Sequence, residues 1–556
     1  MTGLLPGLAV LRRYRIGWLR ADLVAGLTVG AMLIPQSMAY AELAGLAPQF
    51  GFYAVIGALI VYALVGTSRH LGVGPEPGTA ILAAAGVGAI AGGDPERYVT
   101  LMAALALVVS GICLLGAVAR LGFLASLLSK PVLVGYITGV GLTLLSSQIA
   151  GFTGVAITSE TFFPRFEELV AEFGDVDGGT LALAAGTLAL ILVLRRAAPR
   201  VPGALLGVVS ATVVVALFAL DQRGISVVGQ IPAGLPIPGL PDVSVGDLAH
   251  LLPVAAGIAL VGFSDNVLTA RAIAAGRGYR IDANQELLAL GLTNLSSGLS
   301  HGFPVSSSAS RTAVPASLGS KTQLVSLVGA SFVVVALLAM RPLLAEIPRA
   351  ALAAVIVSAA IVIIDVAGYR SLWKVSREEF VVAVVAALGV IVFGVLVGVL
   401  VAVVISVVVA LYRIARPHDA VLGDYLDADG WVDVGAYPEA VTEPGLLVYR
   451  FDAPLFFVNA DRFAERVEQA LSDNPGQEEW LVLDFEGVGA LDATALDMLV
   501  ELVARVDELG VKVVGVARAN DRVLARLALA ALLEPSGPLR VFPTINGAVR
   551  AFRQRG

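Results

Sequence analysis

The stretch HGFPVSSSASRTAV, residues 301–314, decides the fold, because it places a serine-rich run and one arginine inside strongly apolar sequence. A second interruption, LGVGPEPGTAI at residues 71–81, has the same character, since Gly and Pro again lead directly into small residues of helical type. Each stretch predicts a short extended piece followed by a half-length helix. Paired broken helices of this kind indicate a transporter built from an inverted repeat, with its site near the middle of the membrane.

The composition of the 556-residue chain indicates a polytopic membrane protein, because 57% of its residues are hydrophobic and only 15% are charged. The formal net charge of -7 argues against nucleic acid as a partner. Cys113 is the only cysteine, which excludes an intrachain disulfide and a cysteine-based metal cluster. The four histidines lack metal-ligand spacing, so neither a metal centre nor a cofactor is expected.

Apolar stretches that are long enough to cross or half-cross a bilayer fill the chain between residues 21 and 416. Residues 1–20 are basic, lack a signal-peptide pattern and are expected to form a cytoplasmic segment. The transmembrane domain, 21–416, is expected to hold fourteen elements, at 22–44, 48–66, 77–91, 97–119, 131–150, 179–196, 203–220, 250–274, 283–300, 306–318, 323–344, 349–366, 378–393 and 395–414.

The two interrupted elements are the third in each set of seven, which predicts a seven-plus-seven inverted repeat. The even number of elements, with Lys and Arg gathered in alternate loops, places the N- and C-termini in the cytoplasm.

The sequence after residue 416 has the composition of a small soluble α/β domain. Residues 417–444 contain scattered Gly, Asp and Pro and are expected to form a linker. The domain itself, 445–556, is expected to have strands at 445–451, 480–487 and 511–517 and helices at 461–472, 493–509 and 520–533. Thr494, in a helix-opening turn after a strand, is either a regulatory phosphoacceptor or an ordinary first-turn residue.

Arg311 is expected in the first turn of the second half-helix, where the helix dipole disfavours a cation, so a negative group should lie beside it. Exposed backbone N–H groups, the hydroxyls of Ser308 and Ser310 and this guanidinium together suit an anion. The first half-helix would add donors near Thr79 and Ala80. Alternatively, the serines cap the helix and Arg311 pairs with a structural carboxylate.

Two further pairs of polar residues lie four positions apart in expected membrane helices. Gln36 and Tyr40 follow a kink at Pro35 and either complete the site from the side or bond to neighbouring backbone. Asp265 shares a face with Thr269, and a carboxylate at this depth costs about 2.5–3.5 kcal/mol on insertion scales. Asp265 is therefore expected to bind a co-transported H⁺ or Na⁺, or else to position Arg311 through a salt bridge.

The motifs IPQSMAYA, GPEPGTA, PVLVGYITG and PVSSSASRTAV resemble those of the SulP family of sulfate permeases and related anion transporters, and the resemblance covers essentially the whole chain. The C-terminal region resembles a STAS domain, a fold shared with anti-sigma-factor antagonists. The resemblance implies core and gate subdomains, an elevator-like motion, a homodimer and a cytoplasmic STAS domain that can receive a regulatory protein. Matched motif by motif, the substrate position comprises Gln36, Tyr40, Thr79, Ala80, Ser310 and Arg311.

The resemblance also bears on coupling and regulation. Asp265 matches a position where many microbial and plant members keep a carboxylate associated with cation coupling, which favours symport. Thr494 lies in a DAT sequence where phosphorylated antagonists commonly have two serines, which argues against phosphorylation there.

These observations predict a secondary active anion transporter of a bacterial inner membrane, which takes up sulfate together with H⁺ or Na⁺. Bicarbonate or a dicarboxylate is the alternative substrate, and an uncoupled anion channel is the alternative mechanism. A non-transporting anion sensor that signals through the STAS domain is the rival from another class. An enzyme is not expected, because no nucleophile, base and orienting group occur together.

Overall fold

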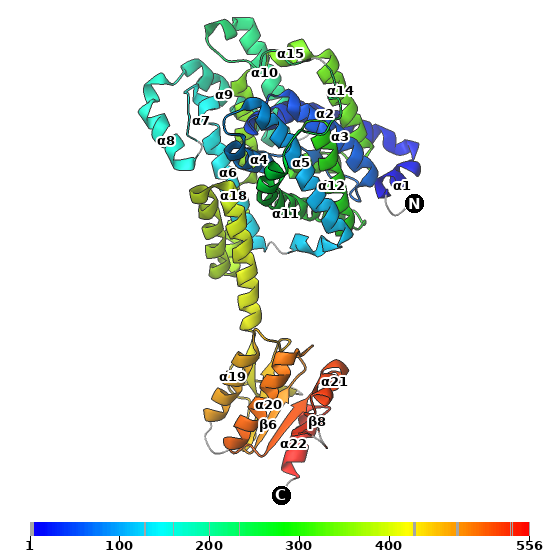
Figure 1. Ribbon diagram of the computed structural model, residues 1–556, viewed down its shortest axis with the longest axis vertical. Coiled ribbons are helices and arrows are strands. Elements are labelled where there is room, and N and C mark those ends of the chain that lie inside the picture. Colours follow the sequence, from blue (N-terminus) through cyan, green and yellow to red (C-terminus); the bar gives the residue numbers. More distant parts are fainter. Residues whose placement is uncertain are drawn as a thin grey trace. The chain divides into compact units, whose positions relative to one another are not determined.

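The computed structural model describes residues 5–126, 129–159, 161–198, 201–232, 234–425, 430–473, 478–533, 535 and 537–554. The chain divides into two compact units, Met1–Ser406 and Val407–Gly556. The described part of the first unit is almost entirely helical, whereas the second combines a β-sheet with helices (Figure 1). The sequence therefore separated a membrane-type part from an α/β part correctly.

The helices of the first unit follow one another with short connections. Up to residue 218 they are α1 (Pro6–Arg12), α2 (Leu19–Leu43), α3 (Gln49–Val65), α4 (Pro77–Ala91), α5 (Pro95–Val118), α6 (Lys130–Ser147), α7 (Ile149–Thr153), α8 (Phe162–Ala171), α9 (Gly178–Ala197) and α10 (Gly203–Phe218). The later ones are α11 (Val245–Ala275), α12 (Ala283–Leu299), α13 (Ala309–Ser317), α14 (Leu324–Ala339), α15 (Arg341–Ala345), α16 (Arg349–Ile363), α17 (Val366–Val375) and α18 (Arg377–Ala415).

A helix lies in each of the fourteen expected ranges, with ends that differ by a few residues. One helix, α18, covers the last two expected ranges, and Gly394 interrupts it with φ 83° and ψ 165°, a conformation that only glycine adopts readily. The short helices α1, α7, α8, α15 and α17 were not expected from the sequence. Among the described residues, five helical segments are long and apolar enough to cross a membrane, and five shorter helices are also apolar.

Small residues let the helices of the first unit approach closely, as is usual for helices packed in a membrane. α2 and α14 lie side by side in Figure 1. A Cβ atom added to Gly26 of α2 would lie 2.6 Å from the Cβ atom of Val328, and one added to Gly30 would lie 2.8 Å from the Cβ atom of Phe332. Glycine at these two positions is therefore what allows the contact.

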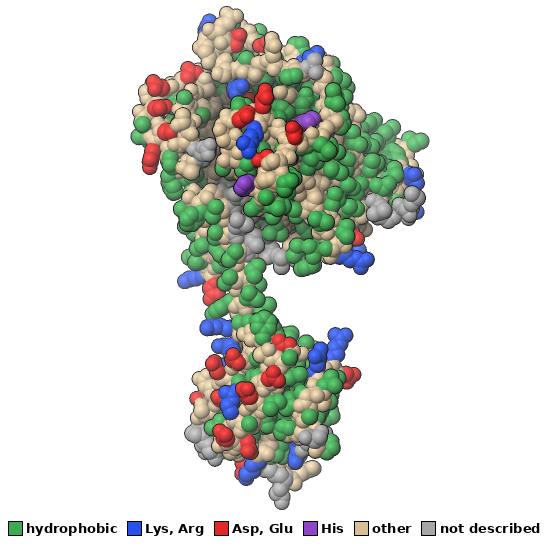
Figure 2. All heavy atoms as spheres, viewed as in Figure 1, with side chains coloured by type: hydrophobic (Ala, Val, Ile, Leu, Met, Phe, Trp, Pro, Cys, Tyr) green, Lys and Arg blue, Asp and Glu red, His purple; other side chains and the backbone are tan. Residues whose placement is uncertain are grey.

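Large apolar side chains are exposed on the helical unit, which identifies a surface suited to lipid rather than water. Hydrophobic side chains cover much of the face of this unit that is seen in Figure 2. The exposed fractions reach 72% for Leu115, 83% for Val118 and 75% for Leu217. Such side chains lose nothing by exposure when their surroundings are hydrocarbon.

The second unit contains one six-stranded sheet in the order β4-β3-β5-β6-β7-β8. Its strands are β3 (Asp419–Tyr425), β4 (Gly430–Asp433), β5 (Leu446–Phe451), β6 (Trp480–Asp484), β7 (Val513–Ala517) and β8 (Leu539–Phe542). Its helices are α19 (Ala460–Ser472), α20 (Ala493–Glu508), α21 (Asp521–Leu529) and α22 (Ile545–Arg553). Strands β5 to β8 are parallel, whereas β3 is antiparallel to both β4 and β5.

Alternate residues of β5 supply two hydrophobic cores, one on each face of the sheet. Tyr449 and Phe451 pack on one face against Phe463 of α19, with ring centroids 5.8 and 5.1 Å from that of Phe463. Leu446 and Val448 belong to the core on the other face, together with residues of α22. Burial on both faces explains why β5 is apolar almost throughout, the pattern that predicted it.

The structure differs from the sequence analysis in the segment 417–444, which was expected to be a linker. Strands β3 and β4 lie there and extend the sheet beyond β5. Leu422 of β3 is buried, and Asp419 pairs in register with Phe451. Strand β8 and helix α22 were also missed. β4 and β8 have only four residues each, and β3 begins and ends with polar residues, so that pairing with neighbouring strands, rather than a long apolar run, defines them.

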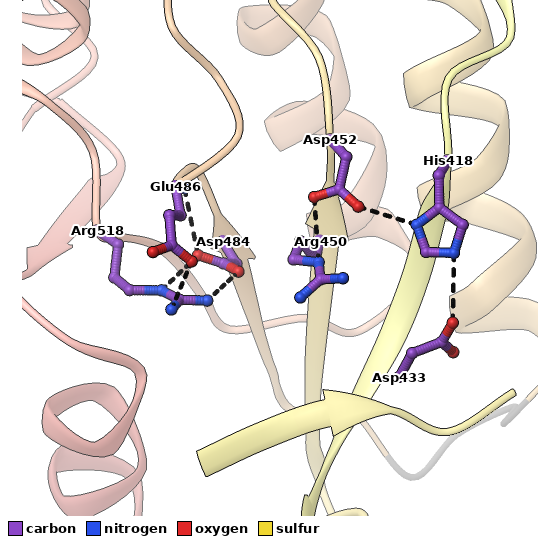
Figure 3. A network of polar contacts seen from close by, with 7 residues as sticks. All are labelled: His418, Asp433, Arg450, Asp452, Asp484, Glu486 and Arg518. Atoms are coloured by element: carbon purple, nitrogen blue, oxygen red, sulfur yellow. Dashed lines mark hydrogen bonds and ion pairs between the residues drawn. The ribbon is translucent and has the colours of Figure 1, made fainter. Parts of the chain in front are cut away.

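Charged side chains meet where the parallel strands of the second unit end (Figure 3). Arg518, which follows β7, donates from Nε to Oδ1 of the buried Asp484 at 2.9 Å and pairs with Glu486 at 2.6 Å. Burial opposes its charge, but the hydrogen bonds and charges of Asp484 and Glu486 raise the pKa of Arg518 overall. In the same region His418 contacts Asp452 and Asp433.

Candidate functional site

The two interrupted stretches of the sequence meet in space, as each half-helix is preceded by a short strand. β1 (Val73–Gly74) and β2 (Ser306–Ser307) pair antiparallel, with Gly74 opposite Ser306. Gly74 has φ 154°, in the region that favours glycine, and this explains why the turn before the first half-helix requires it. The pair brings the starts of α4 and α13 to one place, so the expected extended pieces followed by half-helices are confirmed.

A cavity of about 1040 Å³ lies at this place within the first unit. Its lining includes six of the residues that the sequence singled out, namely Gln36, Tyr40, Thr79, Asp265, Ser308 and Ser310. Three others, Ala80, Thr269 and Arg311, do not line it. The cavity therefore joins residues of α2, α4, α11 and α13 that are as much as 274 positions apart in the chain.

Arg311 occupies the first turn of α13 as expected, but its side chain lies behind the cavity wall. It is only 1% exposed. Its Nη1 atom donates to Oε1 of Gln36 at 3.3 Å, whereas Nε and Nη2 have no hydrogen-bond partner among the described residues. Gly72 allows this helix start to approach closely, since a Cβ atom there would lie 2.9 Å from the Cβ atom of Arg311. A buried cation with two unused donors is costly, and it suits a site that receives an anion.

Asp265 lies on α11 and lines the cavity, but it does not form the salt bridge with Arg311 that the sequence left open. Its Oδ2 atom accepts a hydrogen bond from Oγ of Ser307 at 2.8 Å. Thr269 lies one turn farther along α11, within hydrogen-bonding reach of this carboxylate. The described residues include no ion pair between Asp265 and Arg311. The carboxylate and the guanidinium are therefore separate charges at one site.

The N-termini of the two half-helices differ. Glu76 caps α4, with its Oε2 atom accepting the backbone N–H of Thr79 at 3.0 Å, so one of the expected donors is already used. Ser308 is the N-cap of α13 but makes no cap hydrogen bond through its side chain, which lies 3.1 Å from Oγ of Ser310. The serines thus do not consume the donors of α13. Of the two helix ends, the one that carries Arg311 is the better placed to receive an external anion.

Gln36 and Tyr40 lie on one side of α2, as their spacing predicted. They are 7% and 4% exposed, and both line the cavity. Pro35 lies inside α2, and the helix continues through it. Since Gln36 accepts a hydrogen bond from Arg311, its amide connects the buried guanidinium to the cavity surface.

Tyr136 of α6 is a cavity residue that the sequence analysis did not single out. Its side chain is only 4% exposed and lines the cavity, and its hydroxyl has no hydrogen-bond partner within the described part of the chain. The hydroxyls of Ser306 and Ser307 also line the cavity. Tyr136 lies in PVLVGYITG, so the motif pointed to its helix, but only the tertiary structure brings α6 beside α4.

Thr494 lies in the first turn of α20 in the second unit. Asp492 is the N-cap of this helix and accepts the backbone N–H of Ala495 at 2.8 Å. Thr494 itself is exposed. This geometry fits an ordinary first-turn residue, and a regulatory role for its hydroxyl stays a prediction.

Sequence comparison finds relatives of both parts of the chain. The sequence pattern of the sulfate permease family matches residues 19–386, and that of the STAS domain matches residues 437–548. A protein of Mycobacterium tuberculosis that bears the name probable sulfate transporter is 47% identical over 554 residues, covering 100% of this chain and 99% of the relative. Probable sulfate transporter 4.2 of Arabidopsis thaliana is 31% identical, covering 99% of this chain and 84% of the relative.

The fold also matches a solved structure, that of the murine solute carrier 26 family member A9 anion transporter in the inward-facing state. The TM-score is 0.91 at 24% identity, and the match covers 100% of this chain and 94% of the other. At this identity the likeness concerns the fold alone. Together with the family matches and the close relative, it leads to one conclusion: the chain belongs to the sulfate permease family and carries a C-terminal STAS domain.

Proposed function

We propose that this protein is a secondary active anion transporter that takes up sulfate together with H⁺ or Na⁺. The observation that carries the proposal is Arg311, which is 1% exposed and has two unpartnered nitrogen donors directly behind the cavity wall. An anion in the cavity beside the uncapped start of α13 would offset this charge through the field of the guanidinium and through Gln36. The names of the relatives from M. tuberculosis and A. thaliana support sulfate.

Asp265 is the proposed coupling residue, with Thr269 beside it. Its carboxylate faces the cavity without an ion-pair partner in the described residues, so that it is free to bind a cation when the anion binds. Coupling of this kind requires that the carboxylate and the anion share one cavity, and Asp265 lines the same cavity as the proposed substrate contacts Gln36, Tyr40 and Ser308. The proposed substrate contacts are Gln36, Tyr40, Thr79, Ala80, Ser308, Ser310 and Arg311, of which Ala80 and Arg311 would act from behind the cavity surface.

The proposed setting is the plasma membrane of a bacterium, with both termini in the cytoplasm. Fourteen membrane elements as two inverted sets of seven form the transport domain, 21–416, after a short segment, 1–20. Core and gate subdomains would alternate access by an elevator-like motion. The STAS domain, 445–556, joined to strands within 417–444, would face the cytoplasm of a homodimer and receive regulatory proteins. The paired strands β1 and β2 between two half-helices support the inverted repeat.

Uptake into proteoliposomes tests the proposal. Purified protein is reconstituted, and the uptake of labelled sulfate, bicarbonate and a dicarboxylate is measured with and without inward H⁺ and Na⁺ gradients. Sulfate uptake that depends on one of these gradients is the expected result. Uptake of bicarbonate or the dicarboxylate in place of sulfate would identify that anion as the substrate. Uptake that is the same with and without either gradient would indicate a channel. Binding without uptake of any of the three anions would favour a sensor and refute transport.

A further inference from the structure

Glu76 is a second carboxylate at the cavity, beside Asp265. An anion attracted by Arg311 would be repelled by a negative charge on Glu76, so this carboxylate needs a role of its own. It is the N-cap of α4 and lines the cavity. Its Oε2 atom accepts the backbone N–H of Thr79 at 3.0 Å. A carboxylate at a helix N-terminus occupies the place where a bound anion would otherwise benefit most from the helix dipole.

The charges around the cavity do not favour a dianion when every carboxylate is ionised. Glu76 and Asp265 would carry two negative charges against the single positive charge of Arg311. Lys130 and Arg195 also line the cavity, as does Asp365. Among its described lining residues the cavity thus holds three carboxylates and two cations, with Arg311 behind them. Glu76 caps one half-helix and Asp265 bonds to Ser307 before the other, so that protonation of a carboxylate favours the entry of a dianion there.

The helices packed against α4 bring several polar groups to the cavity that Glu76 lines. α2 contributes Tyr40, α6 contributes Tyr136 and α11 contributes Asp265, and all three side chains line the same cavity. Arg311 of α13 acts on Glu76 through its charge. α5 carries no Asp, Glu, Lys, Arg or His between Tyr98 and Val118, and its one thiol, Cys113, is buried. Arg311 is the cation whose charge acts on Glu76, and Lys130 of α6 lines the same cavity.

We infer that Glu76 binds a proton that travels with the anion, so that a dianion such as sulfate enters with two protons, one on Glu76 and one on Asp265. This inference rests on the proposed function and specifies its coupling ion. In the protonated acid, Oε2 continues to accept from Thr79 while the O–H group on Oε1 donates to a substrate oxygen. When the proton leaves on the cytoplasmic side, the carboxylate regains its charge and repels the anion. A sodium ion is disfavoured here because the helix N-terminus is positive.

The test compares wild-type protein with Glu76→Gln, because the amide keeps an oxygen that can accept from Thr79 but cannot titrate. Labelled sulfate is accumulated in proteoliposomes with the membrane potential clamped at zero and one pH unit across the membrane. Two protons per sulfate give an accumulation of about 100-fold, and one proton gives about 10-fold. Wild type is expected near the first value and Glu76→Gln near the second. A membrane potential should affect only the variant, because its cycle moves one net charge.

Asp94→Asn is the matched control, since Asp94 is also an N-cap carboxylate but is exposed and outside the cavity. It should behave as wild type. Sulfate–sulfate exchange without a gradient should persist in Glu76→Gln, because the amide resembles the protonated acid. If wild type accumulates no sulfate, the proposed function itself fails. If wild type accumulates it and Glu76→Gln retains the 100-fold ratio, or is folded and loses exchange, the inference about Glu76 is overturned while transport stands.

Discussion

Replacement of Arg311 by Met tests whether this arginine binds the anion or only stabilises the fold. Met has similar length and no charge. An anion in the cavity interacts with the guanidinium from behind the wall and through Gln36, and one charge-assisted interaction contributes about 1.5–3 kcal/mol. Its loss corresponds to a decrease of roughly 10–150-fold in sulfate affinity. Uptake at micromolar sulfate should therefore fall sharply.

The stability of the same variant should hardly change. The only hydrogen bond lost within the described residues is the 3.3 Å contact from Nη1 to Gln36, which contributes about 1 kcal/mol or less. Breaking a buried salt bridge would instead cost about 3–5 kcal/mol. Thermal unfolding and sulfate binding of the detergent-solubilised protein measure the two effects. Arg277→Met is the control, because Arg277 is exposed and lies outside the cavity.

Two outcomes would refute this reasoning. Sulfate affinity within a few-fold of wild type would show that Arg311 does not act on the anion. A loss of stability as large as that of a broken buried ion pair would show that the arginine is structural, with a partner that the present contacts do not reveal.

Three further changes test other parts of the protein. Asp265→Asn should lower the accumulation of sulfate from about 100-fold to about 10-fold per pH unit, because Glu76 still carries one proton, and an unchanged ratio would count against this carboxylate as a coupling group. Tyr136→Phe should raise the KM for sulfate about 10–100-fold, because the variant loses a hydroxyl that could donate to the anion. The stability should not change, because this hydroxyl has no partner among the described residues. An unaltered KM would show that Tyr136 does not contact the anion. Arg518→Ala should destabilise the STAS domain by about 3–5 kcal/mol, because it leaves the buried Asp484 without its ion-pair partner. Arg553→Ala removes an exposed ion pair and should cost less than about 1 kcal/mol. Hydrogen exchange of β6 in the full-length protein measures both effects, and equal effects would contradict the argument.

Local sequence was sufficient for the helical elements and for the two breaks. The run of glycine, proline and serine in 71–81 and in 301–314 cannot continue a membrane helix, so that each break is visible without knowledge of the fold. The division of the last apolar run is different, because that run is unbroken in the sequence and the placement of Lys and Arg, rather than a local break, favoured two elements there. Apolar strands such as β5 and β6 were equally visible, because both faces of each are buried.

Long-range contacts decided what local patterns left open. β3 has polar residues at intervals and becomes a strand by pairing with β5. Tyr136 joins the site because α6 packs against α4. Glu76 caps α4, and this role depends on the conformation of the turn before the helix.

The sequence by itself determined that this chain belongs in a membrane, that two half-helices would meet and that an arginine would stand at the start of one of them. Hydropathy and helix-breaking residues act over one or two turns, which is why these features can be read directly. Only the tertiary structure decided that Arg311 lies behind the cavity wall, that it makes no ion pair with Asp265 and that Glu76 occupies the other helix end. Those outcomes depend on side chains that are distant in the chain and close in space.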